Sequence, residues 1–349
     1  MPSLTPRFLN KLTFSHDDLA MQGALGEYKG KQKLFVKQKL RTLESLQTQA
    51  AIESADSSNR LEGITAPPAR IEALVKDKAK PLDRSEQEIA GYRDVMELIH
   101  QTGPDMPITV DVVLQLHQWL CKYMPEEGGH WKTTDNEIVE KDADGTIVRV
   151  RFNALSAVET PQAMQDLIKN YEQALADGRE PMVIIPLFIL DFLCIHPYRD
   201  GNGRISRLLT GLLLYHAGYE VGRYISLEQR FLESSKSYYE TLETSSKGWH
   251  EGQHDVMPWV RYFWGVMLSA YRIFEERVGN IEKGRGSKTK RIRDAVERKV
   301  MPFTMTDIKS DVPDISKDMI RHVLRMMKDE GRVRVEGRGR AARWIPVDR

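Results

Sequence analysis

Residues 196–209 read HPYRDGNGRISRLL and connect two apolar segments through a short run of glycines and charges. The segment before it, Val183–Ile195, is apolar except for Asp191 and predicts a buried helix. Pro197 disfavours helical geometry at the residue before it, so His196 is expected at the edge of the core. The stretch therefore predicts a helix, a polar loop that presents a histidine, and a second helix.

The start of the second helix is suited to bind an anion. Gly201 and Gly203 permit a tight turn and leave backbone N–H groups uncovered, and the helix N-terminus carries a partial positive charge. Arg204 and Arg207 are three residues apart and would share a face of that helix. Guanidinium groups bind phosphate oxygens well. The loop therefore predicts a phosphate site.

Two further residues of the loop point to chemistry as well as binding. Asp200 is a carboxylate at the lip of the loop, placed to share Mg²⁺ with phosphate oxygens. His196 is neutral at cytoplasmic pH and is suited to accept a hydroxyl proton. Together these groups favour phosphoryl or nucleotidyl transfer. The alternative is a polar connection between two helices, with a satisfied histidine and solvated arginines.

The stretch resembles the signature of the Fic family, H-x-F-x-D/E-G-N-G/K-R-x-x-R. Every position from His196 to Arg207 matches, except that Tyr198 stands for the usual phenylalanine. The surrounding helical pattern resembles the family over roughly residues 40–275. The resemblance implies a mainly α fold, namely a Fic-type helical bundle with a small β-hairpin flap.

The resemblance also implies a protein adenylyltransferase, which transfers AMP from ATP to a Ser, Thr or Tyr hydroxyl of a target protein in the presence of Mg²⁺. His196 would deprotonate the hydroxyl, Asp200 would hold Mg²⁺, and Arg207 would hold the γ-phosphate. The remaining loop residues would contact the α- and β-phosphates: Gly201, Asn202, Gly203 and Arg204. Because the phosphotransferring, Doc-like branch often has lysine at the second glycine, Gly203 favours AMP transfer.

A second motif, SSNRLEG, closes the long helix that is predicted over residues 33–61. Ser58 and Glu62 are four residues apart and would face the same way, and Gly63 can end the helix. By local rules alone this is a helix end with an exposed glutamate. In the Fic family the pattern S/T-x-x-x-E-G/N is autoinhibitory. The resemblance therefore implies that Glu62 pairs with Arg207 and weakens or misaligns ATP.

A hairpin is predicted over residues 136–152, with its turn at Asp142-Ala143-Asp144-Gly145. In the Fic family a flap lies here beside the active site, and its edge could hold a target peptide by strand addition. The alternative is an ordinary surface hairpin. Tyr238 and Tyr239 fall where the family encloses adenine, although core packing explains each of them equally well.

The pattern and the charge both change near the C-terminus. Residues 288–349 carry 17 Lys and Arg against 10 Asp and Glu, whereas the rest of the chain carries 34 against 40. Three helices followed by two short strands around a Gly/Arg tip are predicted, which is the order of a winged helix. This domain would bind DNA or protein. The second hypothesis is therefore a DNA-binding regulator whose Fic body senses nucleotide.

The chain of 349 residues is predicted to have three parts. They are an N-terminal helical region with the inhibitory helix, a Fic catalytic core and a winged-helix domain, over residues 1–95, 96–279 and 288–349. Other helices are predicted over residues 84–102, 107–123, 161–177 and 259–278. The family often self-associates, so a homo-oligomer is an open expectation, as are the target protein and the ability to remove AMP.

Composition predicts a cytoplasmic protein without a membrane partner. The net charge is +1 and hydrophobic residues make up 41% of the chain. Two cysteines suggest no disulfide framework, and no signal peptide is evident. The most apolar window, MVIIPLFILDFLCI, is too short to span a bilayer and contains an aspartate.

Overall fold

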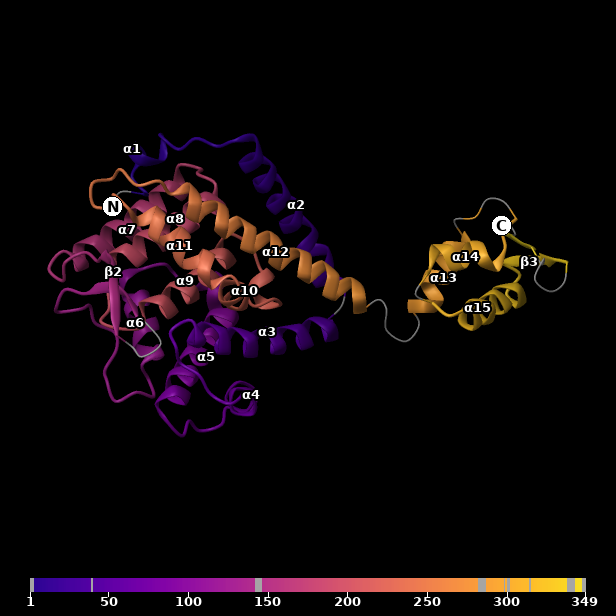
Figure 1. Ribbon diagram of the computed structural model, residues 1–349, viewed down its shortest axis with the longest axis horizontal. Coiled ribbons are helices and arrows are strands. Elements are labelled where there is room, and N and C mark those ends of the chain that lie inside the picture. The colour runs from indigo at the N-terminus through magenta and orange to yellow at the C-terminus, as the bar shows by residue number, and fades with distance from the viewer. Residues whose placement is uncertain are drawn as a thin grey trace. The chain divides into compact units, whose positions relative to one another are not determined.

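The computed structural model describes residues 3–38, 40–141, 146–281, 287–297, 299, 302–313, 315–337 and 343–346. These residues are mainly helical, with two small antiparallel sheets of two strands each (Figure 1), which confirms the predicted fold class. By its contacts the chain divides into a larger unit, Met1–Phe274, and a smaller unit, Glu275–Arg349. The three-part division into residues 1–95, 96–279 and 288–349 stays a prediction.

The larger unit is a helical bundle with one β-hairpin. Its first elements are α1 (Pro6–Leu9), α2 (His16–Gln38), α3 (Leu40–Arg60), α4 (Pro68–Lys76), α5 (Arg84–Thr102), η1 (Gly103–Asp105) and α6 (Val110–Leu120). The hairpin follows as β1 (Glu137–Lys141) and β2 (Ile147–Asn153). The rest are α7 (Thr160–Ala176), α8 (Pro181–Ile195), α9 (Asn202–His216), η2 (Val221–Arg223), α10 (Leu227–Glu233), α11 (Ser235–Ser246) and α12 (Met257–Ile281), whose last seven residues belong to the smaller unit.

Most predicted elements occur within a few residues of their expected bounds. Helix α5 has the predicted bounds, and the hairpin lies where it was expected, although its predicted turn, residues 142–145, lies outside the described residues. The helix predicted over residues 33–61 falls on the end of α2 and on α3, and Lys39, the residue between these two elements, lies outside the described part of the chain. The first part of α2, residues 16–32, was not predicted, and it contains three glycines, each of which costs a helix about 1 kcal/mol relative to alanine.

Helix α8 is the centre of the larger unit and is buried on every face, as its apolar sequence requires. Pro186 lies inside it and lacks the N–H that would bond to the carbonyl of Met182. The indole Nε1 of Trp264 donates to that carbonyl at 2.7 Å and replaces the missing hydrogen bond. Trp259 donates in the same way to the carbonyl of Pro186 at 2.8 Å. Two tryptophans of α12 thus hold the helix that ends at His196.

Asp191 is the one charged residue of α8 and is fully buried. Its Oδ1 accepts hydrogen bonds from Trp249 Nε1 at 2.7 Å and from the Ser3 hydroxyl. Burial raises the pKa of Asp191 to about 6. The carboxyl group therefore joins the N-terminal segment and the loop before α12 to the central helix.

Gly91 lets α5 approach the end of α6. A Cβ at this position would lie 2.0 Å from the carbonyl oxygen of Leu120. We expect Gly91→Ala to lower the melting temperature, because overpacking costs about 1–3 kcal/mol and exceeds the helix-propensity gain of about 1 kcal/mol. Each net kcal/mol corresponds to about 2–4 °C in a domain of this size. Thermal unfolding followed by circular dichroism measures the shift.

The matched control for this prediction is Gly211→Ala in α9. No atom lies within 4 Å of a Cβ built there. The alanine should therefore keep its propensity advantage and leave the melting temperature equal or higher. Equal effects of the two substitutions would contradict the close approach of α5 to Leu120.

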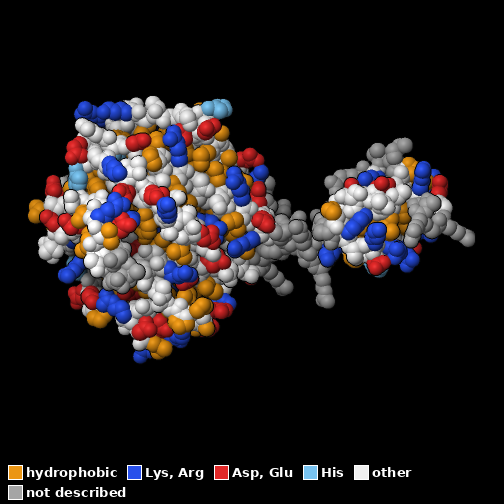
Figure 2. Space-filling model, viewed as in Figure 1, with side chains coloured by type: hydrophobic (Ala, Val, Ile, Leu, Met, Phe, Trp, Pro, Cys, Tyr) orange, Lys and Arg blue, Asp and Glu red, His pale blue; other side chains and the backbone are white. Residues whose placement is uncertain are grey.

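The smaller unit contains α13 (Ser287–Glu297), α14 (Met305–Asp311) and α15 (Lys317–Asp329), followed by β3 (Val333–Glu336) and β4 (Arg343–Pro346), which pair antiparallel. Its core is apolar and includes Ile292, Val323 and Leu324. Figure 2 shows a group of Lys and Arg side chains on the visible face of this unit. The winged-helix assignment and its DNA or protein partner stay predictions, and the predicted tip, residues 338–342, lies outside the described residues.

Within the described part of the chain, no helix combines the length and the apolar character that a bilayer crossing requires. Cys121 and Cys194 are buried free thiols.

Candidate active site

The backbone at the end of α8 sets the position of His196. This residue has φ 51° and ψ 61°, in the left-handed region, and its N–H bonds to the carbonyl of Phe192 at 2.9 Å. Among the described non-glycine residues only Lys78 and His196 have positive φ. Such a conformation costs about 1–2 kcal/mol, and here it turns the imidazole out of the helix into a cavity.

Hydrogen bonding determines which nitrogen of His196 is free. Nδ1 lies 3.2 Å from the carbonyl oxygen of Leu193. Because a carbonyl oxygen can only accept, Nδ1 carries the proton and Nε2 keeps its lone pair. Burial lowers the pKa of His196 to about 4. The ring is therefore neutral at pH 7, with one nitrogen available as a base.

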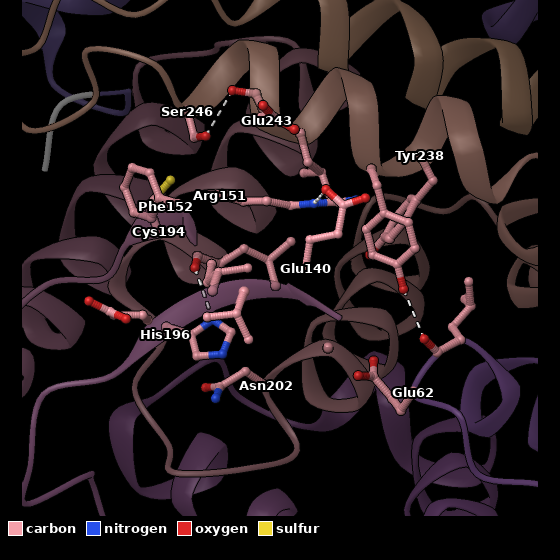
Figure 3. A pocket seen from close by; sticks show the side chains of 18 of the residues that line it. Glu62, Glu140, Arg151, Phe152, Cys194, His196, Asn202, Tyr238, Glu243 and Ser246 are labelled. Atoms are coloured by element: carbon pink, nitrogen blue, oxygen red, sulfur yellow. Dashed lines mark hydrogen bonds and ion pairs between the residues drawn. The ribbon is translucent and has the colours of Figure 1, made fainter. Parts of the chain in front are cut away.

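The cavity has a volume of about 640 Å³ and is bounded by the loop, the hairpin and α11. Its lining includes the predicted residues Glu62, His196, Asp200, Gly201, Asn202, Gly203 and Arg207. The hairpin contributes Glu137, Ile138, Val139, Glu140, Arg151 and Phe152, and α11 contributes Tyr238, Tyr239, Leu242, Glu243 and Ser246. In Figure 3, His196, Asn202 and Glu62 lie across the cavity from Arg151 and Glu140.

Asn202 and Tyr198 hold the shape of the loop. The Asn202 side chain accepts from Tyr198 N at 2.9 Å and donates to Tyr198 O at 2.7 Å. Tyr198 is fully buried, and its hydroxyl donates to the carbonyl of Val113 at 2.8 Å. The tyrosine that replaces the usual phenylalanine therefore keeps the ring in the core and satisfies its extra hydroxyl.

The N-terminus of α9 opens into the cavity. Gly201 precedes it with φ 81°, and no side chain caps the helix, so the first amides of α9 are left without an intrahelical or side-chain partner. A Cβ on Gly203 would lie 2.1 Å from Oε1 of Glu62. A carboxylate therefore already lies against the glycine backbone at this helix end, where a negative charge is stabilised.

Arg207 is buried, and its guanidinium bonds to residues at the end of α3 and just after it. Its Nη2 lies 2.7 Å from Oε1 of Glu62 and 2.8 Å from the carbonyl of Ser58. Its Nε donates to the Ser58 hydroxyl at 2.8 Å. Burial alone would lower the pKa of Arg207, but the Glu62 carboxylate raises it overall. The two residues of the SSNRLEG motif thus satisfy three donor contacts of one arginine.

Arg204 does not share the cavity with His196. It is fully buried, and its guanidinium pairs with Glu88 of α5 at 2.5 Å and with Oδ2 of Asp200 at 3.3 Å. It lines a second cavity of about 540 Å³ on the other side of the loop. Its predicted contact with the α- and β-phosphates stays a prediction, whereas the contact that the structure contains is with Asp200.

The two tyrosines of α11 line the cavity beside the end of α3. The Tyr239 hydroxyl donates to the carbonyl of Leu61 at 2.8 Å, and the Arg151 guanidinium lies 5.3 Å from the centre of its ring. Tyr238 is buried and packs edge-on against Tyr239. Tyr239 therefore fixes the residue next to Glu62, and adenine contact by either tyrosine stays a prediction.

Charged residues that sequence reasoning missed tie the hairpin to α11. Arg149 of β2 makes two hydrogen bonds to Glu243, at 2.8 and 2.9 Å, and one to Glu140 at 2.7 Å. Arg151 also donates to Glu140, at 3.1 Å. The alternating charges of VRVRF were the available signal, but their partners on α11 are distant in the sequence.

Lys132 was also missed, and it caps the end of α8. Its Nζ donates to the carbonyl of Ile195 at 2.9 Å and to the Asn136 side chain at 2.8 Å. Basic groups commonly satisfy the last carbonyls of a helix. Burial lowers the pKa of Lys132 to about 8. The residue next to His196 is thus anchored from the segment that leads into the hairpin.

Comparison with known proteins agrees with this geometry. Residues 107–214 match the model of the Fic/DOC family. A curated relative described as protein adenylyltransferase Fic, from Nematostella vectensis, is 25% identical over 59% of this chain and 44% of its own length. Another with the same description, from Drosophila ananassae, is 28% identical over 58% of this chain and 37% of its own length. The chain thus spans less than half the length of these relatives.

Solved structures show the same fold. A Fic family protein from Desulfovibrio desulfuricans G20 superposes with a TM-score of 0.63 at 19% identity, over 97% of this chain and 98% of its own. A Fic domain containing signaling protein from Bacteroides thetaiotaomicron VPI-5482 superposes with a TM-score of 0.62 at 20% identity, over 74% of this chain and 97% of its own. At these identities the likeness concerns the fold alone.

Proposed function

Because this is a Fic family protein whose residues 107–214 match the Fic/DOC domain, we propose that it is a protein adenylyltransferase, held in an inhibited state by Glu62. It transfers AMP from ATP to a Ser, Thr or Tyr hydroxyl of a target protein and releases pyrophosphate. One observation carries the proposal. A free imidazole nitrogen, an uncapped helix N-terminus and a buried arginine line one cavity, and a carboxylate lies against the last two.

His196 supplies the base. Nε2 takes the proton of the target hydroxyl while its oxygen forms a bond to the α-phosphorus. The bond from the α-phosphorus to the oxygen bridging it to the β-phosphorus breaks, and pyrophosphate leaves with that electron pair. General-base catalysis of this kind contributes about 10²–10⁴ in rate. The Nδ1 contact with the Leu193 carbonyl keeps the ring in the tautomer that the step requires.

The phosphate chain would lie over the start of α9. The amides that follow Gly201 would receive the α- and β-phosphates, and Arg207 would pair with the γ-phosphate. The carboxylate of Glu62, which lies against Gly203 and pairs with Arg207 at 2.7 Å, supports the fit of an anion to this place. Glu62 and the γ-phosphate would therefore compete for one guanidinium.

Asp200 would hold Mg²⁺ together with the phosphates. Its side chain is 73% exposed and lies at the edge of the cavity. Mg²⁺ is commonly bound by one or two carboxylates with substrate phosphates and water, so an exposed single carboxylate suits this ion. When bound, the ion would neutralise negative charge on the phosphates.

The hairpin would hold the target. Residues Glu137, Ile138 and Val139 of β1 line the cavity, and β2 is tied to α11 through Arg149 and Glu243. An extended target segment can add to the hairpin along the edge of β1 by main-chain hydrogen bonds. That placement would bring a side-chain hydroxyl toward His196.

The pH dependence follows from the pKa of His196. Burial lowers it to about 4, below the ordinary value of 6.5. The base is therefore free above this value and lost as the pH falls through about 4. We expect kcat/KM of an activated variant to be level between pH 6 and pH 8 and to fall only below about pH 5. Recovery of activity after return to pH 7 controls for acid unfolding.

Labelled nucleotide tests the proposed reaction. A Glu62→Gly variant is incubated with ATP that carries label in the α-phosphate or in the γ-phosphate. AMP transfer leaves only the α-label on protein, whereas phosphoryl transfer leaves only the γ-label. Retention of the γ-label, or of neither label on the chain or on proteins of a host lysate, would contradict the proposal.

A further inference from the structure

His117 lies on α6, outside the cavity that contains His196, and the reaction proposed above does not use it. Its side chain is buried between the loop at residues 128–131 and the catalytic loop at residues 198–201. It lines the second cavity with Arg204. By sequence it is one histidine in the apolar segment VLQLHQWL, which gives no sign of a role.

The hydrogen bonds of His117 fix its tautomer. The N–H of Gly129 donates to Nδ1 at 3.0 Å, so Nδ1 is the acceptor and Nε2 carries the proton. Nε2 lies 3.1 Å from the carbonyl oxygen of Asp200 and therefore donates to it. This is the opposite tautomer from that of His196. One ring presents a base to a cavity, and the other presents a donor to the backbone of the catalytic loop.

Packing leaves this ring little freedom. It stacks on Tyr198 with centroids 3.7 Å apart and planes inclined by 9°. A Cβ on Gly128 would lie 2.6 Å from the carbonyl oxygen of His117, and one on Gly201 would lie 3.5 Å from Nε2. Gly128 thus allows its loop to pack closely against the backbone of α6 at His117. The ring therefore packs on Tyr198, two residues before Asp200, and bonds to the carbonyl of Asp200 itself.

We propose that His117 is a positioning residue, which holds the backbone of Asp200 so that its carboxylate and the following amides are aligned for the triphosphate. This inference rests on the proposed function. The Asp200 side chain is 73% exposed and pairs with Arg204 at 3.3 Å, so its direction depends largely on the backbone that carries it. Residues that hold a metal ligand in place by a hydrogen bond, without touching the metal, typically contribute about 10–100-fold to metal affinity or activity.

The experiment compares two substitutions in a Glu62→Gly background. His117→Phe keeps a ring to stack on Tyr198 and removes both nitrogens. His117→Gln keeps an N–H donor that can reach the Asp200 carbonyl. We expect His117→Phe to lower kcat about 10–100-fold and to raise the Mg²⁺ concentration that gives half the maximal rate. His117→Gln should restore most of the loss.

A second readout does not depend on activity. Amide hydrogen exchange at residues 199–203 should be faster in His117→Phe than in its parent and close to the parent in His117→Gln. The matched control is His254→Phe, because His254 is equally buried, stacks on Phe8 with centroids 4.6 Å apart, and lies on another segment. That variant should leave kcat and exchange at residues 199–203 unchanged.

The outcomes separate the inference from the function. Unchanged kcat, Mg²⁺ dependence and exchange in His117→Phe would overturn the inference, as would equal losses in His117→Phe and His117→Gln. Absence of transfer by the Glu62→Gly parent would overturn the proposed function. Hydrogen exchange would then still decide whether His117 holds the loop.

Discussion

His196→Ala, in a Glu62→Gly background, is expected to lower the rate of AMP transfer about 10²–10⁴-fold, because general-base catalysis contributes about this factor. The substitution removes the only atom that the proposed reaction uses as a base, Nε2. It leaves the α9 amides and Arg207 in place. The affinity for ATP should therefore change little, and single-turnover transfer with labelled ATP together with an equilibrium binding measurement separates the two quantities.

The control for this variant is His216→Ala. His216 lies at the far end of α9, where its Nε2 is 2.8 Å from the carbonyl of Gly103, and it does not line the cavity. Its loss should leave the transfer rate unchanged. Transfer by His196→Ala at a rate within about threefold of its parent would mean that another group accepts the proton, and the assignment of the base would be wrong.

Glu62→Gly is expected to raise the rate of AMP transfer over the wild type by about 10–150-fold. The carboxylate now occupies Arg207 at 2.7 Å. Its removal would free the guanidinium for the γ-phosphate, and a hydrogen bond to a charged group contributes about 1.5–3 kcal/mol. Initial rates of α-label incorporation, measured at equal protein concentration, give the ratio directly.

Binding of ATP and of AMP tests whether the rise in rate comes from the γ-phosphate contact with Arg207. The affinity for ATP should rise in Glu62→Gly, whereas the affinity for AMP, which has no γ-phosphate, should stay the same. Ser58→Ala serves as the matched variant, because it removes the hydroxyl contact at 2.8 Å but keeps the Glu62 carboxylate, and its rate should rise less. No increase in Glu62→Gly, or equal gains for AMP and ATP affinity, would contradict inhibition at Arg207.

Sequence reasoning succeeded where the decisive residues are contiguous. The boundaries of the loop from His196 to Arg207 are set by residues within it, since a proline and two glycines determine where α8 ends and α9 begins. The contact of Glu62 with Arg207 joins distant segments, and only the family motif could connect them. Gly63 has φ 78°, so the glycine that was expected to end α3 does take a left-handed conformation.

The parts that could not be predicted depend on partners from other helices. Spacing alone put Arg204 and Arg207 on one face, but Glu88 of α5 holds the first and Ser58 of α3 holds the second. The role of His117 depends on a carbonyl 83 residues away. Neither Glu88 nor His117 stands in a pattern that differs from an ordinary buried face, so only the tertiary structure brings them to the loop.

Intact-mass measurement of three proteins incubated with ATP and Mg²⁺ tests the central claim most directly. The wild type, Glu62→Gly and Glu62→Gly/His196→Ala are compared for self-modification and for modification of lysate proteins. The account predicts addition of one or more AMP groups in Glu62→Gly, little in the wild type and none in the double variant. Equal addition in Glu62→Gly and the double variant, or addition of phosphate in place of AMP, would contradict it.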